Sequence, residues 1–144
     1  MKLAKIHIKP EKFRIGNYVM LSSEGCFIEI IGVSRTSVRV TCFSPKFNTF
    51  PLNEVQAIPL AREILIEWCG FTSETQTEEL KKGDIKIVFN DDSTAIVNIG
   101  SINYTINALH ELQNIYYAVM GEELWITPKH GYLGLHVYFP ITEW

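Results

Sequence analysis

Cysteine is scarce in this chain and does not occur in any metal-binding spacing. The 144 residues contain three cysteines, Cys26, Cys42 and Cys69, far apart and each beside an aromatic residue. There is no Cys-x-x-Cys pair and no His-x-x-His pair, which are the spacings of structural zinc sites. We therefore expect free, buried thiols in a reducing compartment, with no metal site and no cofactor.

Long apolar runs are also missing. No stretch approaches the ~20 apolar residues that a membrane-spanning helix needs. The N-terminal residues MKLAKIHIKPEKFRIG alternate charged and apolar side chains and lack the apolar centre of a signal peptide. The expected location is the cytoplasm, without membrane attachment.

The short motifs of common enzyme classes are absent as well. No serine or cysteine lies in a Gly-x-Ser-x-Gly context, and no glycine-rich phosphate loop is present. His130 lies in a turn, and His136 shares one face of a predicted strand with Tyr132 and Tyr138. A small hydrolase or metal-dependent enzyme using His130 and His136 is one hypothesis, but a protein without enzymatic activity is the main expectation.

What the chain does have is the composition of a packed globular protein. It is 47% hydrophobic and 20% charged, and its length suits one domain or two small ones. The charge is divided unevenly, with a net of +4 over residues 1–60 and −7 over residues 61–144. Such a division suggests two surfaces with different partners, or two halves that attract each other.

The first part of the chain is predicted to be β-structure. Short apolar runs alternate with turn signals, namely Gly16-Asn17, the cluster at residues 22–25 and the connection Ser34-Arg35-Thr36. The runs KIHI, RIGNYVML, CFIEIIGV and SVRVTCF are the expected strands, and residues 47–60 supply one or two more. We predict a small barrel over residues 1–58.

The remainder, residues 59–144, is predicted to be an α+β domain, although the two parts could also form one continuous domain. One helix is expected at about residues 61–69, ended by Gly70, and another at about residues 108–120, capped by Asn107 and ended by Gly121. Residues 72–84 are interpreted as a mobile polar connector or a frayed helix. IKIVF and TAIVNIG form a predicted hairpin, and SINYTI, ELWIT and YLGLHVYF are further strands of an antiparallel sheet.

The second helix carries two different stripes. Helical periodicity predicts a stripe that faces the core, made of Leu109, Leu112, Ile115, Tyr116, Val119 and Met120. The opposite side carries an aligned polar stripe without charge, made of His110, Gln113, Asn114 and Tyr117. Uncharged polar groups are less costly to dehydrate than ions, so this stripe is a candidate protein-binding surface. Alternatively, a loop of the same chain covers the stripe and satisfies its hydrogen bonds.

The basic first part suggests nucleic-acid binding as the alternative function. Its cations are interleaved with aromatic residues, the combination with which small barrels bind phosphates and stack on bases. A solvated strand surface with core aromatics fits the same pattern, and the net charge of +4 is modest for a nucleic-acid-binding protein. The candidate contact residues are Lys9, Lys12, Arg14, Arg35, Arg39 and Lys46.

Two resemblances add to this interpretation. RIGNYVML, followed by FIEIIGVSRTSVRV and VQAIPL, resembles the opening of an SH3-like or KOW-like barrel, a fold with many different functions. The order RIGNYV, PLAREILIEWCGF and LHELQNIYYAVMGEELW resembles a family of short uncharacterised proteins encoded by phages and prophage-like regions of bacteria. That family has the pattern HxLQNxYxxxxGxEL near its end.

The resemblance to the phage-linked family covers most of the chain in order, and all eight specified positions of the pattern match here. This sequence departs from the family at Ala61, where a serine or threonine cap is expected, and at Met120, where threonine is commoner. The resemblance implies a phage or prophage origin, in the bacterial cytoplasm or the virion, and it implies no activity. The matching residues are His110, Leu112, Gln113, Asn114, Tyr116, Gly121, Glu123 and Leu124. The expected function is a protein-interaction module that binds a partner or a copy of itself.

Overall fold

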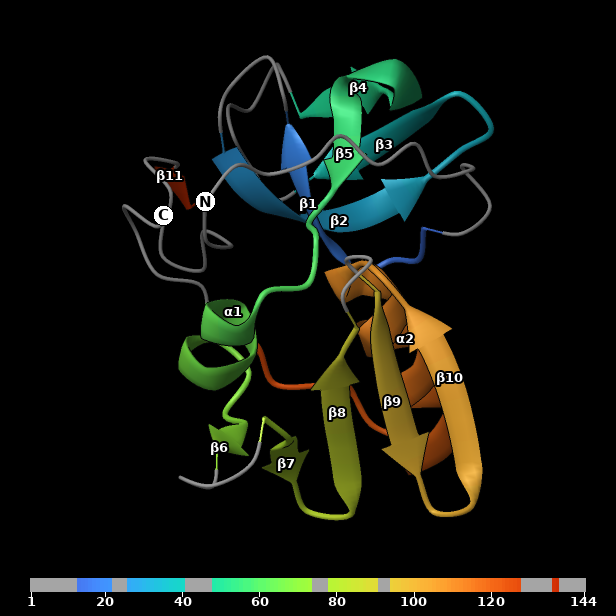
Figure 1. The fold of residues 1–144 in the computed structure, drawn as a ribbon. Coiled ribbons are helices and arrows are strands. Elements are labelled where there is room, and N and C mark those ends of the chain that lie inside the picture. The colour runs from blue at the N-terminus through green and yellow to red at the C-terminus, as the bar shows by residue number, and fades with distance from the viewer. Residues whose placement is uncertain are drawn as a thin grey trace. The chain divides into compact units, whose positions relative to one another are not determined.

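The protein is a mixed α+β structure with two antiparallel sheets and two α-helices (Figure 1). The computed structural model describes residues 13–21, 26–40, 48–73, 78–90, 94–127 and 136–137. It divides into two compact units, Met1–Ile58 with Pro128–Trp144, and Pro59–Thr127. The α+β class predicted from the sequence is confirmed. The expected strand KIHI lies outside the described residues.

The first unit contains a sheet whose strands follow the order β4-β3-β2-β1-β5, with β11 paired in parallel to the start of β2. β2 takes part in two ladders. Its first half pairs with β1, and residues from Ile30 onward pair with β3, with a register shift between Ile30 and Gly32. The strands are β1 (Tyr18–Leu21), β2 (Cys26–Val33), β3 (Ser37–Val40), β4 (Thr49–Pro51), β5 (Val55–Ala57) and β11 (His136–Val137).

This sheet does not close into the barrel that the sequence suggested. Within the described residues the path ends at β4 on one side and at β5 on the other, and the 3₁₀-helix η2 (Leu52–Glu54) connects these two strands. The core is nevertheless well formed. β3, β4 and β5 alternate buried with more exposed side chains, whereas β1 buries Val19, Met20 and Leu21 in succession. The buried residues of the core are Phe13, Val19, Leu21, Ile28, Ile30, Val38, Val40, Phe50 and Val55.

The bend predicted at Gly16-Asn17 is present. Gly16 has a φ of 99°, a conformation that glycine adopts without steric cost, and its N–H donates to Ile30 O at 2.8 Å. The buried Asn17 closes the turn, since its Oδ1 accepts a hydrogen bond from Arg14 N at 2.7 Å. This turn fixes where β1 begins.

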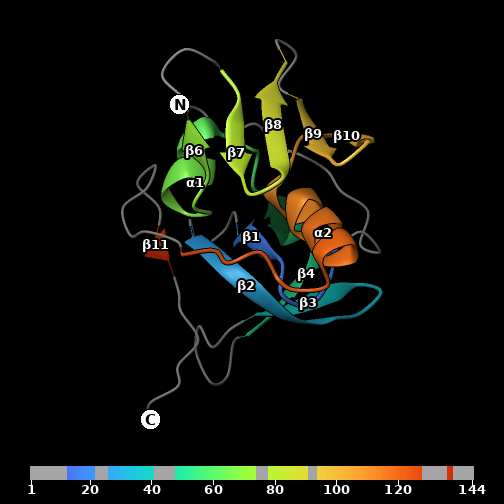
Figure 2. The same cartoon turned by 90° about the horizontal axis from the view of Figure 1, so that it is seen from below.

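The second unit is an antiparallel meander with two helices. Its strands β6 (Thr72–Ser73), β7 (Leu80–Lys82), β8 (Ile85–Phe89), β9 (Ala95–Ile99) and β10 (Ile102–Ile106) pair in sequence order. The helices are α1 (Arg62–Glu67) and α2 (Leu109–Met120). The predicted hairpin of β8 and β9 is confirmed, with Ile85, Ile87, Ala95 and Val97 buried on one face. α2 runs along one face of this sheet beside β9 and β10 (Figures 1 and 2).

The prediction that residues 72–84 form a connector or a helix is wrong, because this stretch contributes β6 and β7. Polar contacts hold these strands where few apolar groups are available. Arg62 donates to Glu78 O at 3.1 Å and to Ser73 Oγ, and Lys82 Nζ donates to Cys69 O at 2.6 Å.

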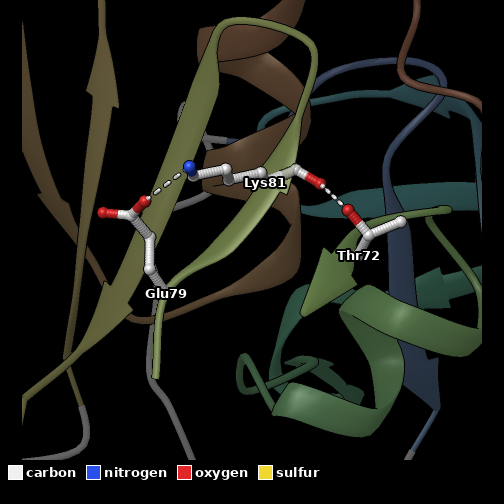
Figure 3. A network of polar contacts seen from close by, with 3 residues as sticks. All are labelled: Thr72, Glu79 and Lys81. Carbon is white, nitrogen blue, oxygen red and sulfur yellow. Dashed lines mark hydrogen bonds and ion pairs between the residues drawn. The ribbon is translucent and has the colours of Figure 1, made fainter. Parts of the chain in front are cut away.

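Figure 3 shows a second polar network on the same strands. Thr72 Oγ1 donates to Lys81 O at 3.3 Å, and Lys81 Nζ lies 3.5 Å from Glu79 Oε1. Ion pairs that remain partly open to solvent contribute little stability, so the backbone pairing of β6 with β7 and of β7 with β8 is what mainly holds these strands together.

α1 ends as the sequence predicts. Gly70 has a φ of 77°, and the buried Phe71 donates its N–H to Leu65 O at 3.0 Å. Trp68, the last residue of the helical turn, is 1% exposed, and its carbonyl accepts a hydrogen bond from Thr127 N at 2.8 Å. This bond fixes the segment that follows α2.

Candidate functional site

The start of α2 is held by backbone contacts on the outside of the helix. Leu60 N donates to Asn107 O at 3.1 Å, and Pro59 forms a β-bridge with Ala108. Ala108 is the N-cap residue and offers no side-chain hydrogen bond, so the prediction that Asn107 caps the helix is wrong. Instead Glu111 Oε1 accepts a hydrogen bond from Asn107 N at 3.1 Å, which places a carboxylate in the first turn, where the helix dipole favours negative charge.

The polar stripe of α2 is divided between the interior and the surface. His110 and Gln113 are buried, at 0% and 2% exposure, while Asn114 is half-buried and Tyr117 is 47% exposed. The first two side chains therefore lie inside this chain. Only the C-terminal part of the stripe reaches solvent.

The core-facing stripe is also interrupted towards the C-terminal end of α2. Leu109, Leu112 and Tyr116 are buried as predicted, but Val119 and Met120 are 43% and 45% exposed, so their assignment to the core is wrong. Every residue of the last helical turn, from Tyr117 to Met120, is exposed. The last turn of α2 therefore lies beyond the residues that pack against the rest of the helix.

α2 ends at a left-handed glycine, and the segment after it carries one large exposed aromatic side chain. Gly121 adopts φ 74° and donates its N–H to Tyr117 O at 3.0 Å, which confirms the predicted helix stop. The predicted strand ELWIT is wrong, because residues 123–127 have no strand structure. Leu124 is buried, whereas Trp125 is 78% exposed and its Nε1–H donates to Thr127 Oγ1 at 3.0 Å.

These observations define a candidate site that we call the exposed apolar segment, consisting of Tyr117, Val119, Met120 and Trp125. The acidic residues Glu122 and Glu123 are exposed within it. The sequence contains no lysine or arginine between positions 109 and 127. Sequence periodicity missed this site, although the lack of any cation near the helix end was a usable signal.

The basic residues proposed for nucleic-acid binding differ in exposure, and half of them lie outside the described residues. Arg35 lies exposed in the turn between β2 and β3, and Arg39 lies exposed on β3. Arg14 is half-buried and donates from Nη1 to Ile15 O at 3.0 Å. Lys9, Lys12 and Lys46 lie outside the described residues.

The aromatic residues among these cations are mostly interior. Phe13, Phe27 and Phe50 are buried and belong to the packed first unit, so they are not available to stack on bases. Tyr18 is half-buried, and Phe43 and Phe47 lie outside the described residues. Where the aromatics are described, the core interpretation of the pattern fits better than base stacking.

Tyr18 should ionise only at strongly alkaline pH. Burial, and secondly the negative charge of Glu29, its cross-strand partner, raise the pKa of the Tyr18 phenol from 10 to about 12. Absorbance titration of the native protein and of Tyr18→Phe should therefore differ by one phenol that ionises near pH 12. A difference that appears near pH 10 would contradict this assignment.

The same pKa shift has a consequence for stability. The unfolded chain loses the Tyr18 proton near pH 10, whereas the folded chain keeps it up to about pH 12. The folding stability that Tyr18 contributes is therefore present below pH 10 and is lost as the pH rises towards 12. Glu29→Gln should lower the pKa only in part, because burial is the larger cause.

Few of the cysteine and histidine side chains named from the sequence lie within the described residues. Cys69 is a buried free thiol, and burial raises its pKa to about 12 against the opposing effect of Lys82, so it stays protonated near neutral pH. His7, His130, Tyr132, Tyr138 and Cys42 lie outside the described residues, and His136 is described only as part of the backbone ladder of β11. Among the described side chains, no three His, Cys, Asp or Glu residues gather in a way that could hold a metal ion.

None of the helices in the described part of the chain is long and apolar enough to cross a membrane. Comparison with protein-family models, curated proteins and solved structures found no match.

Proposed function

We propose that this protein is a non-enzymatic interaction module that binds another protein through the exposed apolar segment. The main support for this proposal is the exposure of Trp125, which is 78%. It follows a final helical turn whose large side chains, Tyr117, Val119 and Met120, are each more than 40% exposed. Trp, Tyr and Met are enriched at protein interfaces, and Trp and Tyr are among the residues that dominate binding energy there. Fully burying one such large apolar side chain contributes about 1.5–3 kcal/mol.

The charges around the segment indicate the kind of partner. Glu122 and Glu123 are exposed beside the apolar residues, and the sequence has no lysine or arginine between positions 109 and 127, so this stretch is acidic. A complementary partner carries an apolar pocket bordered by lysine or arginine. Asn114 and Tyr117, the outer half of the polar stripe, lie at the start of this surface and add hydrogen-bonding groups.

We also propose a phage or prophage origin, with a role in the bacterial cytoplasm or the virion. The support is the sequence pattern around α2. Its apolar members, Leu112, Tyr116 and Leu124, are buried, and its Gly121 provides the left-handed helix stop. The pattern therefore specifies the packing of α2 and the turn after it, and the genes on either side of this one test the origin.

For the first unit we propose an SH3-like arrangement. Its support is the strand order, with β5 beside β1 and the 3₁₀-helix η2 between β4 and β5. Nucleic-acid binding by this unit has weaker support, because Phe13, Phe27 and Phe50 are buried.

Partner capture with matched variants tests the interaction function. The full-length tagged chain is expressed in its natural cell as wild type, as Trp125→Ala and as Ile66→Ala, where Ile66 is a 38% exposed apolar residue on α1. The expected partner is retained by wild type and Ile66→Ala and is lost with Trp125→Ala. With the purified partner, Trp125→Ala should weaken binding by about 30-fold, as removal of a central aromatic contact does.

Carbodiimide coupling tests the chemistry of the partner, because it joins carboxylates to neighbouring lysine amines. We expect coupling from Glu122 or Glu123 to partner lysines, and we expect it to disappear in Glu122→Gln/Glu123→Gln. If every captured protein is retained equally by Trp125→Ala and Ile66→Ala, the exposed apolar segment is not the binding surface.

A further inference from the structure

Within the described part of the chain, β10 is an edge strand with no strand paired to its outer side. It lies at one end of the five-stranded sheet and, among the described strands, pairs only with β9 (Figure 1). In an antiparallel ladder the residues of a strand alternate in direction, so every second residue of β10 presents its N–H and C=O away from β9. The contacts of Pro59 and Leu60 with Ala108 and Asn107 lie just beyond the end of β10.

The devices that normally protect an edge strand are missing from β10. Residues 94–109 contain no Asp, Glu, Lys, Arg or Pro. The register of β9 with β10 runs through five consecutive pairs without a bulge. Ile102 is 51% exposed, and Asn103 and Thr105 are exposed. Charges, prolines and bulges are the usual means of preventing edge strands from pairing with other chains, so β10 is open to a further strand.

The other edge of the sheet differs in strand length and in the charge beside it. Within the described residues β6 comprises Thr72–Ser73, and its neighbour β7 carries Lys81 and Lys82. A short strand beside a charged one offers few unpaired backbone groups to an incoming chain. The two ends of one sheet are therefore unequal, and β10 is the end suited to pairing.

The sequence of this edge is self-complementary when it is reversed. Residues 101–107 read Ser-Ile-Asn-Tyr-Thr-Ile-Asn, which is polar, Ile, polar, Tyr, polar, Ile, polar in both directions. An antiparallel pair of two identical strands centred on Tyr104 places Ile102 opposite Ile106 of the second copy, and Asn103 opposite Thr105. Like residue types then meet on each face, and no charges of the same sign face each other. Two-fold interfaces require such self-complementarity.

We propose that two copies of this chain associate by antiparallel pairing of their β10 strands about Tyr104. The two five-stranded sheets then form one continuous sheet through main-chain hydrogen bonds. The pairing also places the half-exposed Ile102 beside an isoleucine of the second copy. One strand pair buries a small area, so the association depends on concentration and lies at the weak end of specific interfaces. This surface and this occupant are separate from the exposed apolar segment and its partner.

Sedimentation velocity of the full chain over a range of concentrations tests the association. The edge variant Asn103→Lys/Thr105→Lys places lysines opposite lysines in the proposed pair. The matched control Ile96→Lys/Asn98→Lys carries the same charges one strand further in, since Asn98 and Ile96 are the β9 neighbours of Asn103 and Thr105. Wild type and control should dimerise as concentration rises, and the edge variant should dimerise about tenfold more weakly or less.

A monomeric wild type at all concentrations overturns the proposal, as does an edge variant that dimerises like wild type. Trp125→Ala should dimerise like wild type, so failure of the proposed partner binding and failure of this pairing give different results. Circular dichroism of each variant verifies that it is folded.

Disulfide crosslinking tests the register. Directly opposed residues in an antiparallel pair have Cα atoms ~4.5–5.5 Å apart, which lies within the range that a disulfide can bridge. Tyr104→Cys therefore places two thiols opposite each other across the two-fold axis. In Asn103→Cys the two new thiols occupy diagonal positions ~7–8 Å apart, at or beyond that limit.

Under mild oxidation, Tyr104→Cys should give a covalent dimer in non-reducing electrophoresis well above the background that wild type gives from its three native cysteines. Asn103→Cys should remain near that background. Equal crosslinking of the two variants, or none above background for Tyr104→Cys, overturns pairing about Tyr104.

Discussion

Replacing Trp68 with alanine should lower the free energy of unfolding by about 3–5 kcal/mol, the usual cost of removing a large aromatic side chain from a core. Trp68 is 1% exposed at the end of α1, and its carbonyl accepts the Thr127 N–H bond that fixes the segment after α2. Since domains are stable by only about 5–15 kcal/mol, this single change removes a large share of the total. Urea unfolding followed by circular dichroism measures it.

The matched control is the same substitution at the exposed tryptophan. Trp125 is 78% exposed, so Trp125→Ala should change the free energy of unfolding by no more than about 0.5 kcal/mol. The pair separates burial from residue type, because both variants lose the same atoms. Equal losses of stability in the two variants would contradict the burial described for them. A stable Trp125→Ala is also what allows that variant to report on partner binding alone.

Local sequence patterns predicted the elements in which one simple rule dominates. In β8 and β9, Ile85, Ile87 and Val97 alternate with exposed residues, so a period of two identifies the strands. Gly70 and Gly121 both take the left-handed conformation that ends a helix, which depends on adjacent residues alone. These features need no knowledge of distant parts of the chain.

The mistaken predictions depend on contacts between distant residues. β6 and β7 have few apolar side chains. They are held by backbone pairing up to β8 and by the contacts of Arg62 and Lys82 with backbone and hydroxyl groups, and none of these contacts shows in a local pattern. The parallel pairing of His136 with Cys26 joins residues from opposite ends of the chain. No periodicity within one segment contains such information.

The candidate site shows a different limit of periodicity. A spacing of 3.6 residues identifies the face of a helix that turns inward, and this was correct for Leu109 and Leu112. It does not reveal how far along the helix other parts of the chain pack against that face. This packing ends near Tyr116, so Val119 and Met120 are exposed although they continue the apolar stripe. Periodicity also does not show which distant segments pack on the opposite side of the helix, where His110 is buried.

His110→Ala and Tyr117→Ala should therefore have opposite effects, although both residues belong to the same polar stripe. His110 is 0% exposed, and its removal leaves a cavity and takes away hydrogen-bonding capacity in the interior. We expect a loss of about 2–4 kcal/mol in the free energy of unfolding. Gln113→Ala, at a 2% exposed position, should be destabilising for the same reason.

Tyr117 is 47% exposed, so Tyr117→Ala should change stability by less than about 0.5 kcal/mol while it weakens binding of the proposed partner. Urea unfolding and binding titrations on both variants measure the two quantities separately. Under conditions where it is fully folded, His110→Ala should bind with nearly the affinity of wild type. A stable His110→Ala that no longer binds would instead place His110 at the contact surface, and the burial of the N-terminal half of the stripe would have to change when the partner binds.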